Sequence, residues 1–188
     1  MLRWLRKRSE TARRARELYG SVVTAARQPA FYGVTGVPDT PEGRFELVAL
    51  HLYLAIEGLR TIEPAADDLR QRMIEVFVED MDDCMREMGV GDLTVPKKVK
   101  RAAAAFYERA TIYHRGVTED EESGLAASLR GTILGDIKGR EDASRALARY
   151  VKAASAALTA ERFDKWVQSG AAERLLETSI SNIRMTAT

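Results

Sequence analysis

Few side chains in this sequence could act as a nucleophile or a general base at neutral pH. The chain contains one cysteine, Cys84, and two histidines, His51 and His114. Nucleophilic catalysis needs a nucleophile, a base that activates it and a group that orients the base. Cys84 follows the apolar stripe of a helical pattern rich in carboxylates, where burial and negative neighbours both raise the pKa of a thiol. Both histidines also fall on apolar helical patterns, so structural roles are favoured and we expect the protein not to be an enzyme.

A short run of carboxylates could attract a cation: Glu79, Asp80, Asp82 and Asp83. The run lies within a helical pattern and lacks both the loop spacing and the glycine of an EF-hand. Two distant histidines and one cysteine are too few ligands for a zinc site. We therefore expect no metal and no other cofactor.

Asp80 differs from the other carboxylates of this run, because its helical angle places it near Met73 and Phe77. A half-buried carboxylate requires a partner. We expect an internal ion pair with Arg44 or Lys98, in preference to a general base. Structural ion pairs are expected at four residues: Asp80, Asp82, Arg86 and Asp92.

Two short glycine-containing segments could in principle approach a phosphate. Residues 33–36 and 89–91 match neither the phosphate loop of nucleotide-binding proteins nor the dinucleotide fingerprint. We expect no small-molecule substrate.

Charge is strongly segregated along the chain, although the net charge is only +1. Residues 1–16 are basic, residues 63–92 are acidic, and a second basic block comprises Lys97, Lys98, Lys100 and Arg101. Cations are unfavourable at a helix N-terminus, so the second block indicates a partner or an acidic neighbour. An RNA contact and a solvated helix face are both compatible with it, and we expect no essential nucleic acid.

The first residues of the chain interleave apolar and basic side chains. This pattern is typical of a short interfacial anchor, in which basic residues face anionic lipid and Trp lies among the headgroups. Membrane contact is expected at five residues: Leu2, Arg3, Trp4, Leu5 and Arg6. A frayed basic tail explains the pattern equally well, and residues 1–16 are interpreted as a basic arm or as the start of a helix.

The length and composition of the chain suit one globular domain. Its 188 residues are 45% apolar and 30% charged, enough to form a core without disulfides. No stretch approaches the ~20 uncharged apolar residues of a transmembrane helix, and no apolar signal region follows the basic start. Apolar residues recur at helical spacing and no run alternates with period two. We predict an all-α, single-domain, irregular helical bundle over residues 17–188.

The helix that begins near Thr40 should occupy the centre of this bundle. Asp39 or Thr40 can cap it, and Pro41 suits its first turn. Two apolar stripes follow, including Leu52, and a helix this apolar should run through the core. One line of residues looks solvent-exposed: Glu46, Tyr53, Glu57 and Arg60. Residues 28–40 before the helix are predicted to form a long ordered loop.

The next helical pattern carries an apolar stripe rich in methionine. Its members are Leu69, Met73, Phe77, Met81, Cys84 and Met88. Gly89 is a natural C-cap for this helix, and Pro96 begins another. Weaker helical patterns continue toward the C-terminus.

Several ungapped phrases between Leu18 and Tyr113 carry a family signature. They are Leu18-Tyr19, Ala26-Arg-Gln-Pro29, Phe31-Tyr32, Gly36-Val-Pro-Asp-Thr-Pro-Glu-Gly-Arg-Phe45, Leu50-His51, Met81-Asp82, Arg86-Glu-Met-Gly-Val-Gly-Asp-Leu93, Val95-Pro-Lys-Lys98 and Ala105-Phe-Tyr107. In these phrases the chain resembles the ubiquinol–cytochrome c chaperone family, the assembly factors of the cytochrome bc1 complex. Glu108 stands where the family phrase has a glycine, and the C-terminal third carries little of the signature.

The resemblance implies a helical chaperone, a bacterial relative of the mitochondrial cytochrome b chaperone. It would bind newly synthesised (nascent) cytochrome b and assist its entry into the bc1 complex. Mitochondrial relatives work with a small partner protein at the ribosome, so the ribosome or the membrane surface is a further expected partner. The expected location is cytoplasmic, peripheral at the bacterial inner membrane. The alternative is a lipid- or RNA-binding regulator that uses the N-terminal arm and the Lys97–Arg101 patch.

A chaperone for a membrane protein needs an adaptable apolar surface, and methionine is an adaptable apolar residue. Met73 and Met81 are expected in the core, whereas Met85 and Met88, near the helix end, are expected to line a groove. The expected client-binding residues are Tyr32, Arg44, Met85, Met88, Lys97, Lys98, Phe106 and Tyr107.

Overall fold

The computed structural model describes residues 2–33, 35–119, 122–135, 139–159 and 162–186, with side chains described from Arg6 to Ser181 within these ranges. In this part of the chain the helices are α1 (Leu2–Ala26), α2 (Pro29–Gly33), α3 (Pro41–Ile62), α4 (Asp67–Glu87), α5 (Val95–Thr118), α6 (Glu122–Thr132), α7 (Glu141–Ala157), α8 (Phe163–Gln168) and α9 (Ala171–Thr186). The described residues contain no strand, and the predicted all-α fold is confirmed.

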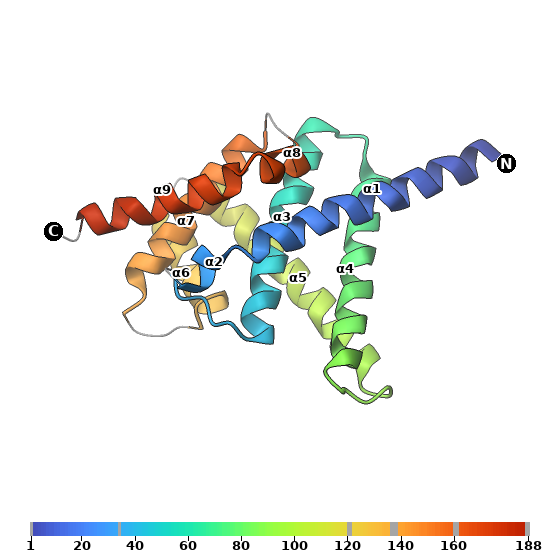
Figure 1. Cartoon of the computed structure of the whole chain (residues 1–188), viewed down its shortest axis with the longest axis horizontal. Helices are drawn as coiled ribbons and strands as arrows, with labels where there is room; N and C mark the ends of the chain where they lie inside the picture. Colours follow the sequence, from blue (N-terminus) through green and yellow to red (C-terminus); the bar gives the residue numbers. More distant parts are fainter. Residues whose placement is uncertain (1, 34, 120–121, 136–138, 160–161, 187–188) are drawn as a thin grey trace.

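Helix α3 forms the centre of the fold and contacts α1, α4, α5, α7 and α8 (Figure 1). Thr40 caps it, because its hydroxyl accepts a hydrogen bond of 3.1 Å from the backbone N–H of Gly43. Pro41 occupies the first turn, where its missing N–H costs nothing. Residues on both apolar stripes, Leu52 among them, are fully buried.

The prediction of one exposed line on α3 was wrong for two of its residues. Glu46 is buried against α5, where its carboxylate accepts hydrogen bonds from Arg109 at 3.1–3.3 Å. Tyr53 is also buried, with its ring centroid 5.7 Å from that of Tyr113. Both contacts come from α5, which covers the polar line of α3.

The other helices form two groups around α3 (Figure 1). On one side α1 packs against α4, and α4 and α5 form an antiparallel hairpin. On the other side α7 packs between α6 and α9, while α8 contacts α1, α3 and α9. Helix α1 crosses α3 and is continuous from residue 2, so residues 2–16 are helical.

The segment before α3 is less irregular than the sequence predicted, because Pro29–Gly33 forms the short helix α2. Phe31 of this helix is buried, with its ring nearly perpendicular to those of His51 and Tyr150 at centroid distances of 5.2 and 5.3 Å. This aromatic contact holds the segment against α3 and α7.

Candidate functional site

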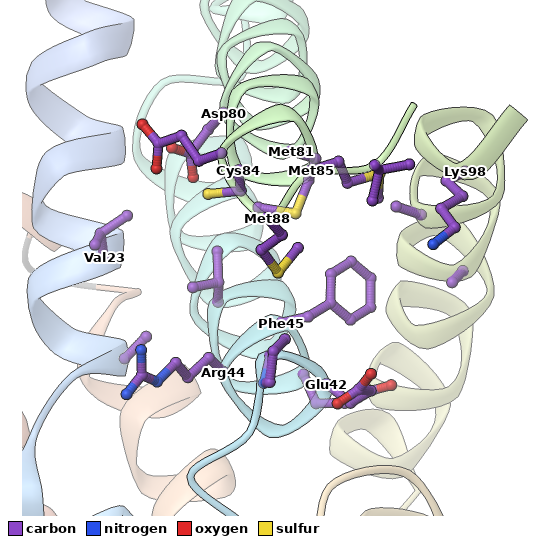
Figure 2. Close-up of a pocket in the computed structure, with 18 of the residues that line it drawn as sticks. Val23, Glu42, Arg44, Phe45, Asp80, Met81, Cys84, Met85, Met88 and Lys98 are labelled. Carbon is purple, nitrogen blue, oxygen red and sulfur yellow. The ribbon is translucent and has the colours of Figure 1, made fainter. Parts of the chain in front are cut away.

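A groove of about 890 Å³ lies between α1, α3, α4 and α5 (Figure 2). Its apolar lining consists mainly of Val23, Phe45, Val48, Met81, Met85 and Met88. The groove is open to solvent, since Met88 is 56% exposed. It is therefore a surface feature that another molecule can enter.

The groove arises because the apolar stripe of α4 extends beyond the part of the helix that the core covers. Met73 and Phe77, on the first half of the stripe, are fully buried. Met81 and Met85 are half-buried and Met88 is exposed. These three methionines follow the i, i+4, i+7 spacing of one helix face, and Figure 2 shows them grouped beside Phe45.

The end of α4 is shaped by Gly89, as the sequence predicted. Gly89 has a φ of 77°, a conformation that glycine adopts without steric cost. Its N–H donates to the carbonyl of Arg86 at 2.9 Å, and the N–H of Val90 donates to the carbonyl of Met85 at 3.0 Å. This pair of bonds is a Schellman motif, which brings the side chain after the glycine back toward the helix. Val90 accordingly lines the groove together with Met85.

Arg86 connects the end of α4 to the turn that follows. Its guanidinium lies 2.5 Å from a carboxylate oxygen of Asp82 and 2.6 Å from one of Asp92. The sequence suggested ion pairs at these three residues without naming the partners, and the two pairs join the turn to the end of α4. Both carboxylates raise the pKa of Arg86.

Asp80 does not form the expected ion pair. Its carboxylate accepts a hydrogen bond of 2.6 Å from the hydroxyl of Tyr19 on α1, and in the described structure it pairs with neither Arg44 nor Lys98. Arg44 instead pairs with Asp39 at 2.7 Å, within the same segment of the chain. The prediction failed because α1 brings a buried hydroxyl closer to Asp80 than any cation.

Cys84 was expected as a buried packing residue of the stripe, and it lies half-buried on the groove wall. Burial, followed by the charge of Asp80, raises the pKa of its thiol. The thiol is therefore protonated at neutral pH and has little nucleophilic character.

The two histidines lie outside the groove lining. His51 is fully buried, with Nδ1 2.7 Å from the carbonyl of Leu47 and Nε2 2.8 Å from the hydroxyl of Tyr150. Burial lowers the pKa of His51 to about 4, so it is neutral and structural. His114 is exposed on α5, with Nδ1 3.8 Å from a carboxylate oxygen of Glu57.

The mouth of the groove carries charges of both signs. Lys98 and Arg101 of α5 contribute on one side, and Arg27, directly after α1, on another. Glu42 and Glu87 contribute negative charge. An apolar floor with a polar rim is the usual anatomy of a protein-binding surface.

Five of the eight residues expected to bind a client line this groove: Tyr32, Arg44, Met85, Met88 and Lys98. Lys97 and Tyr107 are exposed on α5 outside the lining. Phe106 is buried, with its ring centroid 5.5 Å from that of Phe77, so it belongs to the core and not to the surface.

Sequence reasoning assigned Met81 to the core and did not assign Phe45, Val23 or Val90 to a groove. All four line the groove. For Met81, the available signal was its place on the α4 stripe, one turn before Met85. Val23 falls on the apolar face of α1 with Val22, but which of the two meets the groove depends on how α1 crosses α4.

The residues expected at the membrane lie largely outside the described structure. This applies to the side chains of Leu2, Arg3, Trp4 and Leu5, whereas Arg6 is exposed on α1. Among the described helices, none is long and apolar enough to cross a membrane. The described side chains also contain no cluster of ligands suited to a metal ion.

Comparison with known proteins places the chain in a family. The sequence profile of the ubiquinol–cytochrome c chaperone family matches residues 34–168. The chain belongs to this family. The match begins later than the resemblance at Leu18 and extends further, into the C-terminal third, where the sequence alone showed little of the signature.

A solved structure supports the same assignment. The crystal structure of the Cbp3 homolog from Brucella abortus is 34% identical to this chain, with a TM-score of 0.73. The similarity covers 85% of this chain and 88% of that one. The search of curated proteins gives no match. The assignment to the chaperone family therefore rests on both sequence and fold.

Proposed function

We propose that the protein is an assembly chaperone of the cytochrome bc1 complex that holds an apolar helical segment of newly synthesised cytochrome b in the α1–α3–α4–α5 groove. The observation that carries the proposal is a row of three uncovered methionines at the end of α4, Met81, Met85 and Met88, in a member of the ubiquinol–cytochrome c chaperone family. We call this row the methionine seam. Before assembly, a membrane protein exposes apolar helix surface to water and to other chains unless a chaperone covers it.

The geometry of the seam suits a helix. Met81, Met85 and the C-cap residue Met88 lie on one face at the end of α4, seven residue steps or about 10 Å apart at a rise of about 1.5 Å per residue. This length matches about two turns of a client helix laid into the groove, the helix-in-groove mode of recognition. Methionine adapts to different apolar shapes, so the seam can accept more than one segment of a client.

The charged rim limits which segments fit. An apolar helix that enters the groove leaves its polar flanks beside Lys98 and Arg101 on one side and Glu87 on another. Unpaired charge placed on the apolar floor would cost binding energy, because it could not be solvated there. The floor therefore favours segments with an uninterrupted apolar face.

The proposal requires no catalytic step. The Cys84 thiol has a raised pKa and His51 is buried and neutral, so neither is prepared for nucleophilic or acid–base chemistry. Cofactor chemistry would belong to the client. A cytoplasmic location, peripheral at the inner membrane and near the ribosome, follows from a client that is a nascent membrane protein.

A substitution at the most exposed methionine tests the proposal. Met88→Asp places a carboxylate in the groove at a side chain that is 56% exposed, so the fold should persist by circular dichroism while capture of nascent cytochrome b falls about tenfold or more. Ala104→Asp is the matched control, since Ala104 is exposed on α5 outside the groove lining. Undiminished capture by folded Met88→Asp protein would place client binding elsewhere.

A further inference from the structure

The turn between α4 and α5 presents an apolar side chain that the described chain leaves uncovered. Leu93 is 100% exposed. It lies in the turn at the far end of the hairpin, which extends beyond the neighbouring helices in Figure 1. A single exposed leucine is ordinary on a protein surface, so the surroundings of Leu93 decide whether it has a role.

The backbone around Leu93 is held in place. The N–H groups of Thr94 and Val95 donate to the carbonyl of Gly91 at 2.7 and 3.2 Å, and the Val95 side chain is fully buried. Asp92 pairs with Arg86 at 2.6 Å at the surface. The backbone hydrogen bonds and the buried Val95 therefore anchor the turn that exposes Leu93.

The residues that follow Leu93 form a positive surface. Lys97, Lys98, Lys100 and Arg101 are all exposed, and the sequence contains no Asp or Glu from residue 93 to residue 107. These four cations span about 6 Å along α5 at a rise of about 1.5 Å per residue, which is within one Debye length of about 8 Å at physiological salt. The N-terminal end of the helix dipole adds to their positive potential, and Arg86 offsets the charge of Asp92.

We propose that this hairpin tip, residues 89–101, binds the surface of an anionic lipid bilayer. Leu93 inserts at the boundary between headgroups and acyl chains, and the four cations contact lipid phosphates. A fixed apolar side chain beside a cluster of cations is the arrangement by which peripheral proteins combine hydrophobic and electrostatic attraction to a membrane. The proposal does not depend on client binding in the groove.

Charge and composition favour lipid over RNA as the occupant. Proteins that bind single-stranded nucleic acid stack bases on aromatic side chains. Residues 88–105 contain no aromatic residue and Phe106 beyond them is buried, while the exposed Tyr107 lies about 9 Å along α5 from Arg101 at a rise of about 1.5 Å per residue. An exposed leucine cannot bind a phosphate, whereas it can insert into a bilayer.

Lipid binding at the tip would also orient the groove. Val90 and Lys98 belong to the hairpin tip and line the groove, so its mouth would lie beside the bilayer surface. If the proposed function holds, this places the groove where a client helix meets the membrane.

Vesicle binding by the full-length protein tests the proposal. The protein should sediment with vesicles of phosphatidylcholine and phosphatidylglycerol, less so at high salt, and only weakly with phosphatidylcholine alone. Leu93→Glu should weaken binding to anionic vesicles about tenfold, since it removes the leucine that inserts into the bilayer and adds a negative charge. Replacing Lys97, Lys98, Lys100 and Arg101 by Gln should have an effect at least as large.

Two matched controls separate the tip from exposed residues in general. Tyr107→Ser removes an exposed aromatic side chain outside the tip, on α5. A second quadruple Gln variant removes four exposed cations elsewhere: Arg60, Arg115, Arg145 and Lys165. Both should bind vesicles like the original protein. Equal losses in the tip variants and their controls would overturn the proposal.

A spectroscopic readout tests insertion directly. Because Cys84 is the only cysteine, Leu93→Cys in a Cys84→Ala background can carry one environment-sensitive fluorophore. Its emission should shift to the blue on anionic vesicles and not on neutral ones. An unchanged emission, or binding of single-stranded RNA that vesicles do not compete away, would overturn the assignment to lipid.

Discussion

The hydroxyl of Tyr19 on α1 donates a hydrogen bond of 2.6 Å to Asp80 on α4. This bond joins the two helices along one wall of the groove. Burial, together with Asp80, raises the pKa of Tyr19 well above its usual value near 10, so the hydroxyl stays protonated and remains a donor. The half-buried carboxylate thus has a partner that does not depend on pH in the physiological range.

Tyr19→Phe should lower the free energy of unfolding by about 1–3 kcal/mol, because Asp80 loses its hydrogen-bond donor. Urea unfolding of the two proteins measures this. Tyr107→Phe removes an exposed hydroxyl and should change stability by less than about 0.5 kcal/mol. Equal stabilities of the Tyr19→Phe variant and the parent would show that water replaces the hydroxyl without cost.

Leu52→Ala should lower the free energy of unfolding by about 2–5 kcal/mol, because Leu52 is fully buried in the central helix. Leu93→Ala, at a fully exposed leucine, should change it by less than about 0.5 kcal/mol. Urea denaturation distinguishes the two. A loss below about 0.5 kcal/mol for Leu52→Ala would contradict the position of α3 in the core.

Arg109→Met should destabilise the fold by about 2–3 kcal/mol, at or below the range for fully buried ion pairs, because it leaves the Glu46 carboxylate buried without its partner. Burial already raises the pKa of Glu46, and Arg109 counters that effect. The double variant Glu46→Gln, Arg109→Met should recover part of the loss. A double-mutant cycle in urea measures the coupling, and additive losses would argue against the pair.

His51 should make the fold less stable in mild acid. Its pKa is about 6.5 when unfolded and about 4 when folded, because burial disfavours the charged ring. The unfolded chain therefore takes up a proton first, and stability that is complete above pH 6.5 falls as the pH drops toward 4, by about 3 kcal/mol in total. In His51→Gln, this part of the pH dependence should disappear from urea unfolding measured between pH 7 and pH 4. An identical pH profile in the variant would rule out His51 as its source.

Much of α4 could be predicted from sequence, because helical period is a local property. The spacing identified which residues share the methionine stripe and where Gly89 ends the helix. It could not show that burial stops partway along, since Met73 and Met88 follow the same pattern and only one is buried. A helix face is covered by a neighbouring helix, and the period of one helix does not encode where that neighbour lies.

The partners of charged residues were harder to predict. The helical angle of Asp80 correctly indicated half-burial, yet its partner Tyr19 lies 61 positions away in the sequence. Glu46 falls on the polar line of α3, but α5 covers that line and supplies Arg109. In both cases the partner is set by how distant helices pack, and a charge pattern along one helix carries no record of that packing.

Site-specific photo-crosslinking to nascent cytochrome b tests the central claim most directly. A photoreactive residue at Met85 or Met88 on the groove, or at Ala127 on the exposed face of α6 as a control, reports which surface meets the client. We predict crosslinks from positions 85 and 88 and none from position 127. Crosslinks from position 127 with none from the groove would contradict the account.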